Sequence, residues 1–457
     1  MQYVAGRQTL AIFRSADGFT VEILAPLTWP FEKQNEQMTV NHHRHISVLQ
    51  HAQARYKTAI LQHKSKKILK DIVRATLPAM AIPSYDRSAR DEGIIKLVLY
   101  TLRNIAIIEH PAPGECETGE EIDRSATITA YTEQNVLDLL LTTASSIADD
   151  FKAQDTVIME ALYHLIKGLD VEAVFRSDGE ESEKRGKDLA QLLKKEDDLK
   201  RGISRASTRH NRFGSTIWMQ RIDGTRSFVS GQDALLSKET GLEKLDKAKK
   251  WKKARGADKA GVSLKTEFDM TVSLTTGAKK HMRRFVEDFI DSGFNPLFES
   301  IRRAIERDVE RLLESHIKQC FYLVAWFLEA ERVRRRISTK ERKKKGLPAE
   351  EDNFAVVAVV LSQQFLTTLN RKMVEWFDIK QWTALQSGMR CFTQILYTVQ
   401  EMALSPIEDD QEIAENIQNR LFYEETTMDL IYNICRSYTK QPFKYVALLY
   451  LVGAAGS

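Results

Sequence analysis

The chain has 457 residues, 43% of them apolar, so it can bury a sizeable core in one large domain or in two or three smaller ones. Lys and Arg number 67 against 63 Asp and Glu, and the resulting net charge of +4 is too small to indicate a partner by itself. The apolar runs, such as CFYLVAWFL and YVALLYLVGAA, are too short to span a bilayer, and the N-terminus lacks a signal-peptide pattern, so no membrane association is expected.

Four cysteines occur in the chain, and none has the CxxC spacing of a zinc site or a redox pair. Cys320 and Cys391 fall inside apolar helical patterns, so we expect reduced residues in the core. This use of cysteine fits a reducing compartment, either the cytosol or the nucleus.

Apolar residues recur at steps of three and four along most of the chain, which is the period of an amphipathic helix. Residues 309–328 show this pattern best, with a wide apolar stripe from Val309 to Leu328. Alternation at period two is rare, so a large sheet is not expected. In chain order, helices are predicted at about 45–62, 64–80, 90–109, 133–149, 154–167, 282–305, 309–328, 353–377, 380–403, 409–422 and 424–437.

Two helix ends carry a recognisable signal. Gly168 stands where a glycine with a left-handed backbone ends a helix. The stretch SPIE at 405–408 predicts Ser405 as an N-cap, with Pro406 at the first helical position and Glu408 as the capping-box partner.

Helices of this length joined by short loops form a bundle or an α-solenoid. The chain has no repeat of fixed length, and irregular solenoid repeats diverge in sequence while they keep their packing. We therefore predict an all-α fold, an irregular armadillo- or HEAT-like helical-repeat solenoid that carries a long charged insertion.

Two stretches, 169–280 and 338–352, interrupt the helical pattern, and both are longer than an ordinary connection. They suggest N-terminal helical repeats at 1–168, a charged insertion with a basic loop at 169–280, and C-terminal helical repeats at 281–457. The first and last parts are expected to form one continuous solenoid.

The insertion has some local structure of its own in the sequence. TIWMQ (216–220) and RSFVS (226–230) favour extended chain, and Asp223-Gly224 between them is a turn signal, so a small hairpin is predicted. Short surface helices are predicted at 184–200 and 238–255. The second contains a thin apolar seam that is typical of either a docking helix or a marginal surface helix.

Motifs for catalysis or cofactor binding do not stand out. GxGxxG, GxxxxGK[ST], GxSxG and HExxH are all missing from the sequence. The histidine cluster NHHRH at 41–45 lacks converging ligands, so a solvated start of a helix is a better interpretation than a metal site. We expect neither an enzyme nor a cofactor.

The strongest signal for function is the segregation of charge. Residues 200–222 hold six bases and no acid, and 331–345 hold nine bases and two acids. Phosphates require Lys and Arg without competing acids, and the aromatic rings of Phe213 and Trp218 are able to stack on a base or pack on a protein. A solvated loop is the plain alternative for the first segment. The second fits a nuclear import signal or a helix C-terminus that favours cations.

The stretch TRHNRFGSTI, followed by TRSFVSGQDALLSKETGLEKLDKAKKW, resembles the central region of the Timeless family of replication-fork proteins, most closely its fungal members. LTWP, RDEGIIKLVLYTLRNIAIIE, EDFIDSGFNPLFESI, YLVAWFLEAER and NRLFYEE occur in the same order as in that family. The resemblance covers roughly 25–435.

This resemblance implies a nuclear helical-repeat scaffold without catalytic activity. Family members pair with the small subunit Tipin, work with Claspin, contact the MCM helicase and grip parental duplex DNA. They support fork pausing, DNA repair and the S-phase checkpoint. The family's extended element corresponds to about 200–255, which leaves open which residues contact DNA and which the helicase. The candidate contacts are Arg205, Arg209, His210, Arg212, Phe213, Lys249, Lys250, Trp251, Lys252 and Lys253.

The two ends of the chain depart from the family pattern. MQYVAGRQTLAIFRSADGFT does not resemble the helices that precede LTWP in the family, and YVALLYLVGAAGS replaces further helix, so a fragment or an altered gene product is expected. The surface for the Tipin-like subunit is expected around 380–437. The main alternative function is a helical-repeat adaptor or transport receptor that binds acidic proteins without DNA, and a hydrolase with an unrecognised site is a third.

Overall fold

The computed structural model describes most of the chain, and the account below is confined to that part. Two compact units are present, one formed by 1–176 with 265–457 and the other by 177–264. The described residues are 21–30, 39–63, 66–109, 122–176, 186, 189–198, 217–220, 224, 226–229, 272–308, 311–345, 354–423 and 425–436.

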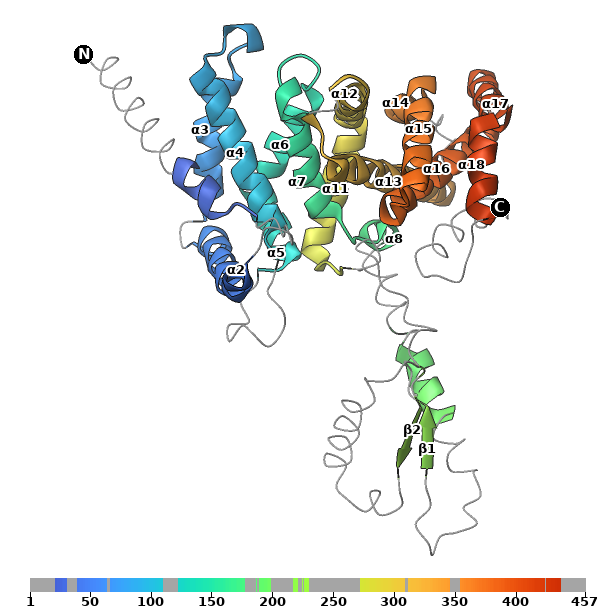
Figure 1. Cartoon of the computed structure of the whole chain (residues 1–457), viewed down its shortest axis with the longest axis horizontal. Coiled ribbons are helices and arrows are strands. Elements are labelled where there is room, and N and C mark those ends of the chain that lie inside the picture. Colours follow the sequence, from blue (N-terminus) through green and yellow to red (C-terminus); the bar gives the residue numbers. More distant parts are fainter. Residues whose placement is uncertain are drawn as a thin grey trace, which may run out of the picture. The chain divides into compact units, whose positions relative to one another are not determined.

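Unit 1 is built from helices, which confirms the predicted all-α fold. Figure 1 shows them running broadly from blue to red in chain order, and helices further apart in sequence also pack together, such as α4 with α7 and α13 with α16. Its α-helices in chain order are α2 (Val40–Leu61), α3 (Ile68–Met80), α4 (Ala89–Ile107), α5 (Arg124–Glu133), α6 (Val136–Ser145), α7 (Asp155–Ile166), α8 (Val171–Phe175), α11 (Thr276–Ser292), α12 (Phe294–Arg307), α13 (Glu314–Lys345), α14 (Ala358–Leu361), α15 (Gln363–Ile379), α16 (Trp382–Ala403), α17 (Glu408–Tyr423) and α18 (Glu425–Arg436). Short 3₁₀ turns lie at Ser84–Asp86, Lys152–Gln154 and Phe354–Val357.

Helix α13 is the centre of unit 1. It packs against α16, α7, α8, α11 and α12. The run from Cys320 to Leu328 is buried on every side, which explains why the sequence there is apolar without interruption. The indole Nε1 of Trp326 donates a hydrogen bond to the Leu169 carbonyl at 2.8 Å, so even the polar edge of this buried ring is satisfied. Cys391 on α16 and Cys320 are free and buried, as expected.

Two differences from the predicted elements have clear physical causes. Residues 282–305 form parts of two helices instead of one, with Gly293 between them at a corner where a Cβ would lie 2.9 Å from the Phe289 ring and 3.2 Å from the Ala144 Cβ. Helix α5 was not predicted. Its sequence RSATITAYTE has no clear apolar stripe, and the Thr127, Thr129 and Thr132 hydroxyls donate to carbonyls four residues back.

The predicted interruption at 338–352 is wrong for 338–345, because α13 continues as helix to Lys345. The predicted cap of α17 is right only in part: the Ser405 hydroxyl accepts from the Ile407 N–H at 3.4 Å, but the helix begins at Glu408, three residues after Ser405. The Ser405 hydroxyl also donates to Asp410 at 3.2 Å. Gly168 has φ +76°, which confirms the expected left-handed helix end.

Unit 2 contains the predicted hairpin. Strand β1 (Ile217–Gln220) pairs antiparallel with β2 (Arg226–Val229), with Ile217 opposite Val229 and Gln220 opposite Arg226. Gly224, in the turn, has φ +78°. Residues 189–198 are helical, within the predicted range 184–200, whereas the predicted helix at 238–255 lies outside the described residues. None of the described helices is long and apolar enough to cross a membrane.

Candidate nucleic-acid interface

The predicted contacts in the insertion cannot be placed, since all of them lie outside the described residues. These are Arg205, Arg209, His210, Arg212, Phe213, Lys249, Lys250, Trp251, Lys252 and Lys253. The structure does describe the other cationic segment, 331–345, together with the helices that hold it. The site is therefore built from α13 and its surroundings.

The motif LTWP forms one anchor of the frame. The Asn104 amide on α4 donates to the Thr28 hydroxyl at 3.4 Å, and the Gln53 amide on α2 donates to the Trp29 carbonyl at 2.5 Å. The Arg103 guanidinium lies over the Trp29 ring at 4.7 Å and over the Tyr100 ring at 4.8 Å. The motif thus packs against α2 and α4 around the buried guanidinium of Arg103.

That cation belongs to a chain of charges that crosses unit 1. Arg103 forms an ion pair with Glu160 on α7 at 2.7 Å, and Glu160 contacts His316 on α13 at 3.1 Å. Burial alone would raise the pKa of Glu160, but the hydrogen bond with His316 and the charge of Arg103 together lower it. These side chains fasten α4, α7 and α13 to each other.

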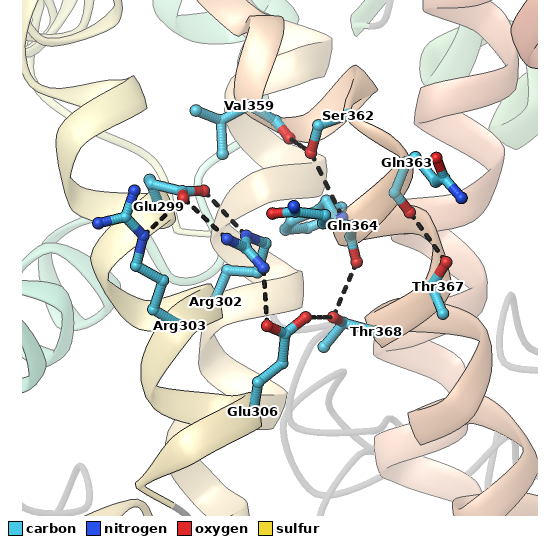
Figure 2. Close-up of polar contacts among 11 residues, drawn as sticks. Glu299, Arg302, Arg303, Glu306, Val359, Ser362, Gln363, Gln364, Thr367 and Thr368 are labelled. Atoms are coloured by element: carbon cyan, nitrogen blue, oxygen red, sulfur yellow. Dashed lines mark hydrogen bonds and ion pairs between the residues drawn. The ribbon is translucent and has the colours of Figure 1, made fainter.

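A second polar brace joins α12 to α15. Figure 2 shows Glu299 between Arg302 and Arg303, and Glu306 between Arg302 and Thr368. The Thr368 hydroxyl donates to Glu306 at 2.8 Å, and Arg302 reaches both acids at 2.8–2.9 Å. Since the Arg302 side chain is only 5% exposed, its charge is compensated inside the protein and is not available to a ligand.

The first cations of the 331–345 segment are also used internally. Arg334 pairs with Glu331 at 2.7 Å and with Asp291 on α11 at 2.8 Å. Arg335 pairs with Glu331 at 3.0 Å and lies 3.9 Å from the centre of the Phe354 ring. Since both acids and a ring are committed to these arginines, this part of the segment is structural.

Arg332 is held in the same way, by side chains of α16. Its guanidinium lies 4.6 Å from the centre of the Tyr397 ring and 3.5 Å from Glu401, both on α16. Burial lowers the pKa of Arg332, while the Glu401 carboxylate opposes that shift. We call Arg332, Arg334 and Arg335 the proximal arginines.

The distal part of α13 is different. From Arg336 to Lys343 most residues are exposed, although Ile337 packs against the core. Arg336, Lys340 and Lys343 are spaced by four and three residues, so they lie on one side of the helix. None of the three has an ion-pair partner in the described part of the chain. We call them the distal stripe.

The stripe suits an anionic partner. Successive members are about 6 and 4.5 Å apart along the helix axis, given a rise of about 1.5 Å per residue. Three uncompensated charges at this spacing are able to follow the phosphates of a nucleic acid or an acidic protein surface. The sequence already contained the signal, the spacing of i, i+4 and i+7 within ERVRRRISTKERKKK, but composition alone did not separate these cations from the proximal arginines.

Lys57, on α2, is a further basic side chain that is buried. The Lys57 ammonium donates to the Ile108 carbonyl at 2.7 Å. Burial, with the nearby charge of Arg124, lowers the pKa of Lys57 to about 7. The histidine cluster lies in the first turns of α2, which begins at Val40. Within the described ranges, no group of three or more His, Cys, Asp or Glu side chains is placed to hold a metal ion.

Comparison with known proteins finds a family model and several relatives that match the chain. A family model described as Timeless protein matches residues 16–219. Relatives named Topoisomerase 1-associated factor 1 are 50% identical to the chain over 432 residues in Aspergillus fumigatus and 50% over 435 residues in Neosartorya fischeri. The relative of that name from Coccidioides immitis is 48% identical over 431 residues.

Each of these alignments covers 93% of this chain and 37% of the relative. The chain therefore spans little more than a third of the length of the curated relatives that it matches. The alignments extend over nearly the whole sequence, so they include the helical frame, the insertion and α13. The chain thus matches the Timeless family model at 16–219 and resembles these fungal relatives over 93% of its own length.

Proposed function

We propose that this chain is a non-enzymatic scaffold of the replication fork protection complex, which acts in the nucleus and binds duplex DNA. The observation that carries the proposal is the match to the fungal relatives, 50% identical over 93% of the chain. Their name associates those relatives with topoisomerase 1, an enzyme that works on duplex DNA.

The proposed partners follow from the family. They are the MCM helicase, a Claspin-like mediator and a Tipin-like small subunit that forms a heterodimer with this chain. Through them the scaffold would stabilise and pause forks and support DNA repair and the S-phase checkpoint. The Tipin-like subunit is assigned to the end of the solenoid, at 380–437, where α16, α17 and α18 lie.

Two groups of cations support the proposal of DNA binding. The insertion carries six bases and no acid at 200–222. The distal stripe carries three exposed cations without ion-pair partners among the described residues. A scaffold that contacts DNA through phosphates alone needs charge at fixed spacing and no base-reading motif.

A salt series tests the contribution of the insertion. The intact chain and an Arg205/Arg209/Arg212→Ala variant are compared for binding to labelled duplex DNA. Each phosphate that is no longer neutralised flattens the slope of log affinity against log salt by about 0.9, so three of them would flatten it by about 2.7. Equal slopes would show that this loop does not contact DNA and would make the MCM helicase the next partner to test.

The distal stripe also favours a second candidate function. Helical-repeat adaptors and transport receptors present surfaces to other proteins, and a row of cations matches an acidic protein as well as it matches phosphate. Binding to an acidic protein without measurable affinity for duplex DNA would support this alternative against the fork scaffold. Turnover that depends on a metal or a nucleotide would instead support a hydrolase.

A further inference from the structure

Two hydroxyl groups lie on adjacent residues of α13, within the part that carries the distal stripe. Ser338 and Thr339 are both exposed. The Thr339 hydroxyl donates to the Arg335 carbonyl, four residues back, at 2.9 Å. Neither hydroxyl takes part in the ion pairs of the proximal arginines, and the binding of an anion by the distal stripe does not require them. The surroundings of these two hydroxyls differ in three ways.

Thr339 lies on the side of the helix that carries the distal stripe. At about 100° per residue, it is turned about 60° from the first member of the stripe and about 40° from the last, and the middle member follows it directly. Ser338 is turned about 140–160° away from all three members. The only acid in 336–343 is Glu341, on the opposite side of the helix from Thr339. A negative group on Thr339 would therefore meet three cations, whereas one on Ser338 would not.

The arginines that precede the two hydroxyls differ in availability. Kinases select substrates by their pattern of charge, and many of them require an arginine three residues before the acceptor hydroxyl. For Ser338 that residue is Arg335, whose side chain is 11% exposed and is held by an acid and an aromatic ring. For Thr339 it is Arg336, which is exposed and has no ion-pair partner among the described residues. The sequence RRRIST offers both acceptors, and the structure favours the second.

The helix is also weak where the two hydroxyls lie. Ile337, Ser338 and Thr339 have a poorer helix propensity than the Arg, Lys and Glu residues on both sides of them. Ile337 is the one hydrophobic side chain in 336–343, and it packs against the core. The backbone beyond it opens at a low cost in free energy, because few buried contacts are lost. A kinase is therefore able to draw the Thr339 hydroxyl away from the Arg335 carbonyl while the proximal arginines stay in place.

We propose that Thr339 is a phosphorylation site and that its phosphate occupies the distal stripe in place of an external anion. In the reaction, the Thr339 Oγ1 attacks the γ-phosphorus of ATP. The Oγ1–P bond forms as the bond from that phosphorus to the bridging oxygen breaks, and ADP leaves. The hydroxyl proton passes to a carboxylate of the kinase and then to solvent.

The phosphate compensates most of the charge of the stripe. It carries about 1.5 to 2 negative charges at pH 7, and opposite charges three and four residues apart on a helix attract each other. These spacings join the phosphate to Arg336 and Lys343. Less positive charge then remains for a nucleic acid, so phosphorylation switches the stripe off. This last step rests on the proposed function, because it requires that the stripe binds an anionic partner.

Phosphorylation of the full chain tests the site itself. The chain is treated with ATP and a purified kinase that selects arginine three residues before its acceptor, and mass spectrometry locates the phosphate. Thr339 is expected to carry roughly fivefold more phosphate than Ser338, and Arg336→Gln should slow the reaction roughly tenfold, because it removes the available arginine. Arg371→Gln, at an exposed arginine elsewhere, should leave the rate as it is. Phosphate on Ser338 alone, or on neither residue, would overturn the proposal.

Phosphorus NMR of the phosphorylated chain tests the contact with the stripe in the absence of DNA. The second pKa of the phosphothreonine should lie below its ordinary value of about 6, because nearby cations favour the doubly charged form. Lys340/Lys343→Gln removes two of those cations and should move the pKa back towards its ordinary value. An ordinary pKa in the intact chain would show that the phosphate does not occupy the stripe.

Binding to labelled duplex DNA separates this proposal from the proposed function. Phosphorylation should weaken binding and flatten the slope of log affinity against log salt by up to about 1.8, for two DNA phosphates that are no longer neutralised. Thr339→Glu should act in the same direction, and Ser338→Glu, with the same charge on the opposite side of α13, should not. Equal effects of the two variants would contradict the switch. A lowered phosphate pKa with unchanged DNA binding would keep the phosphorylation site and remove the stripe from the proposed function.

Discussion

The two halves of the cationic segment of α13 are similar in composition and opposite in environment. The proximal arginines are held by Glu331, Asp291 and Glu401 and by two aromatic rings. The distal stripe is exposed and has no such partners among the described residues. A run of positive charge in a sequence therefore indicates a binding site poorly. Only those cations that have no ion-pair partner within the protein are available to a ligand.

The largest effect on stability is expected when the acid that pairs with the proximal arginines is removed. Glu331→Ala leaves Arg334 and Arg335 partly buried without their shared acid, since Glu331 itself is only 3% exposed. The free energy of unfolding, measured by urea denaturation, should fall by about 3–5 kcal/mol. The matched change Glu341→Ala, at an exposed distal position of the same helix, should stay within about 0.5 kcal/mol. Similar losses of stability for both variants would contradict the division of the segment into a structural proximal half and an exposed distal half.

Lys57 extends the comparison to a cation that is buried and held by a carbonyl rather than an acid. Its pKa is about 7 in the folded protein against an ordinary value of 10.5. Between these values the unfolded chain binds the proton and the folded protein does not, so the free energy of unfolding rises with pH from about 7 to 10.5. This contribution is on the order of a few kcal/mol.

The variant Lys57→Met should remove this rise. The measurement is urea denaturation at several pH values between 7 and 10, where the variant's stability should be flatter than that of the intact chain. The variant also loses the hydrogen bond to the Ile108 carbonyl, so its stability at pH 10 is expected to lie below that of the intact chain. The same slope in both proteins would show that Lys57 is not buried as a neutral amine.

Gly293 lies at the corner between α11, which carries Asp291, and α12. A substitution at Gly293 tests how tightly this corner is packed. A Cβ at this position meets the Phe289 ring at 2.9 Å and the Ala144 Cβ at 3.2 Å. Gly293→Ala should therefore lower the free energy of unfolding by about 1–3 kcal/mol through overpacking. Gly277→Ala is the control, since nothing lies within 4 Å of its added Cβ. An equal effect of both changes would show that the corner is not tightly packed.

The smallest effect on stability is expected for the distal stripe. Arg336/Lys340/Lys343→Gln removes exposed charges near the end of a helix, so the free energy of unfolding should fall by less than about 1 kcal/mol. Circular dichroism during thermal unfolding provides the measurement. A large decrease in stability would show that these side chains are also structural.

The helices and the hairpin could be predicted from the sequence where the pattern of apolar residues or a turn signal reflected the fold. The uninterrupted apolar run at 320–328 predicted a buried helix segment, and the turn signal that includes Gly224 predicted the hairpin of β1 and β2. Helix α5 escaped prediction because its threonines satisfy themselves within the helix and leave no stripe. The corner at Gly293 leaves no room for a Cβ beside Phe289 and Ala144, and the proximity of Ala144 was not visible in a single sequence.

The candidate site was less predictable than the frame. The distal stripe directly follows the proximal arginines within fifteen residues of one helix, and nothing in their order shows that Asp291 and Glu401 lie beside the former. Those contacts depend on how α11 and α16 pack against α13. Compensation of charge is a tertiary property, so only the fold separated the two groups.

The most direct measurement tests the distal stripe as a ligand for duplex DNA. Affinity is followed across a salt series for the intact chain, for Arg336/Lys340/Lys343→Gln, and for the charge-matched control Lys67/Arg90/Arg371→Gln, whose members are exposed but scattered. We predict that only the stripe variant weakens binding and flattens the log–log slope, by about 0.9 for each phosphate that the variant no longer neutralises. Equal slopes for the two variants would show that the stripe is no more than general surface charge.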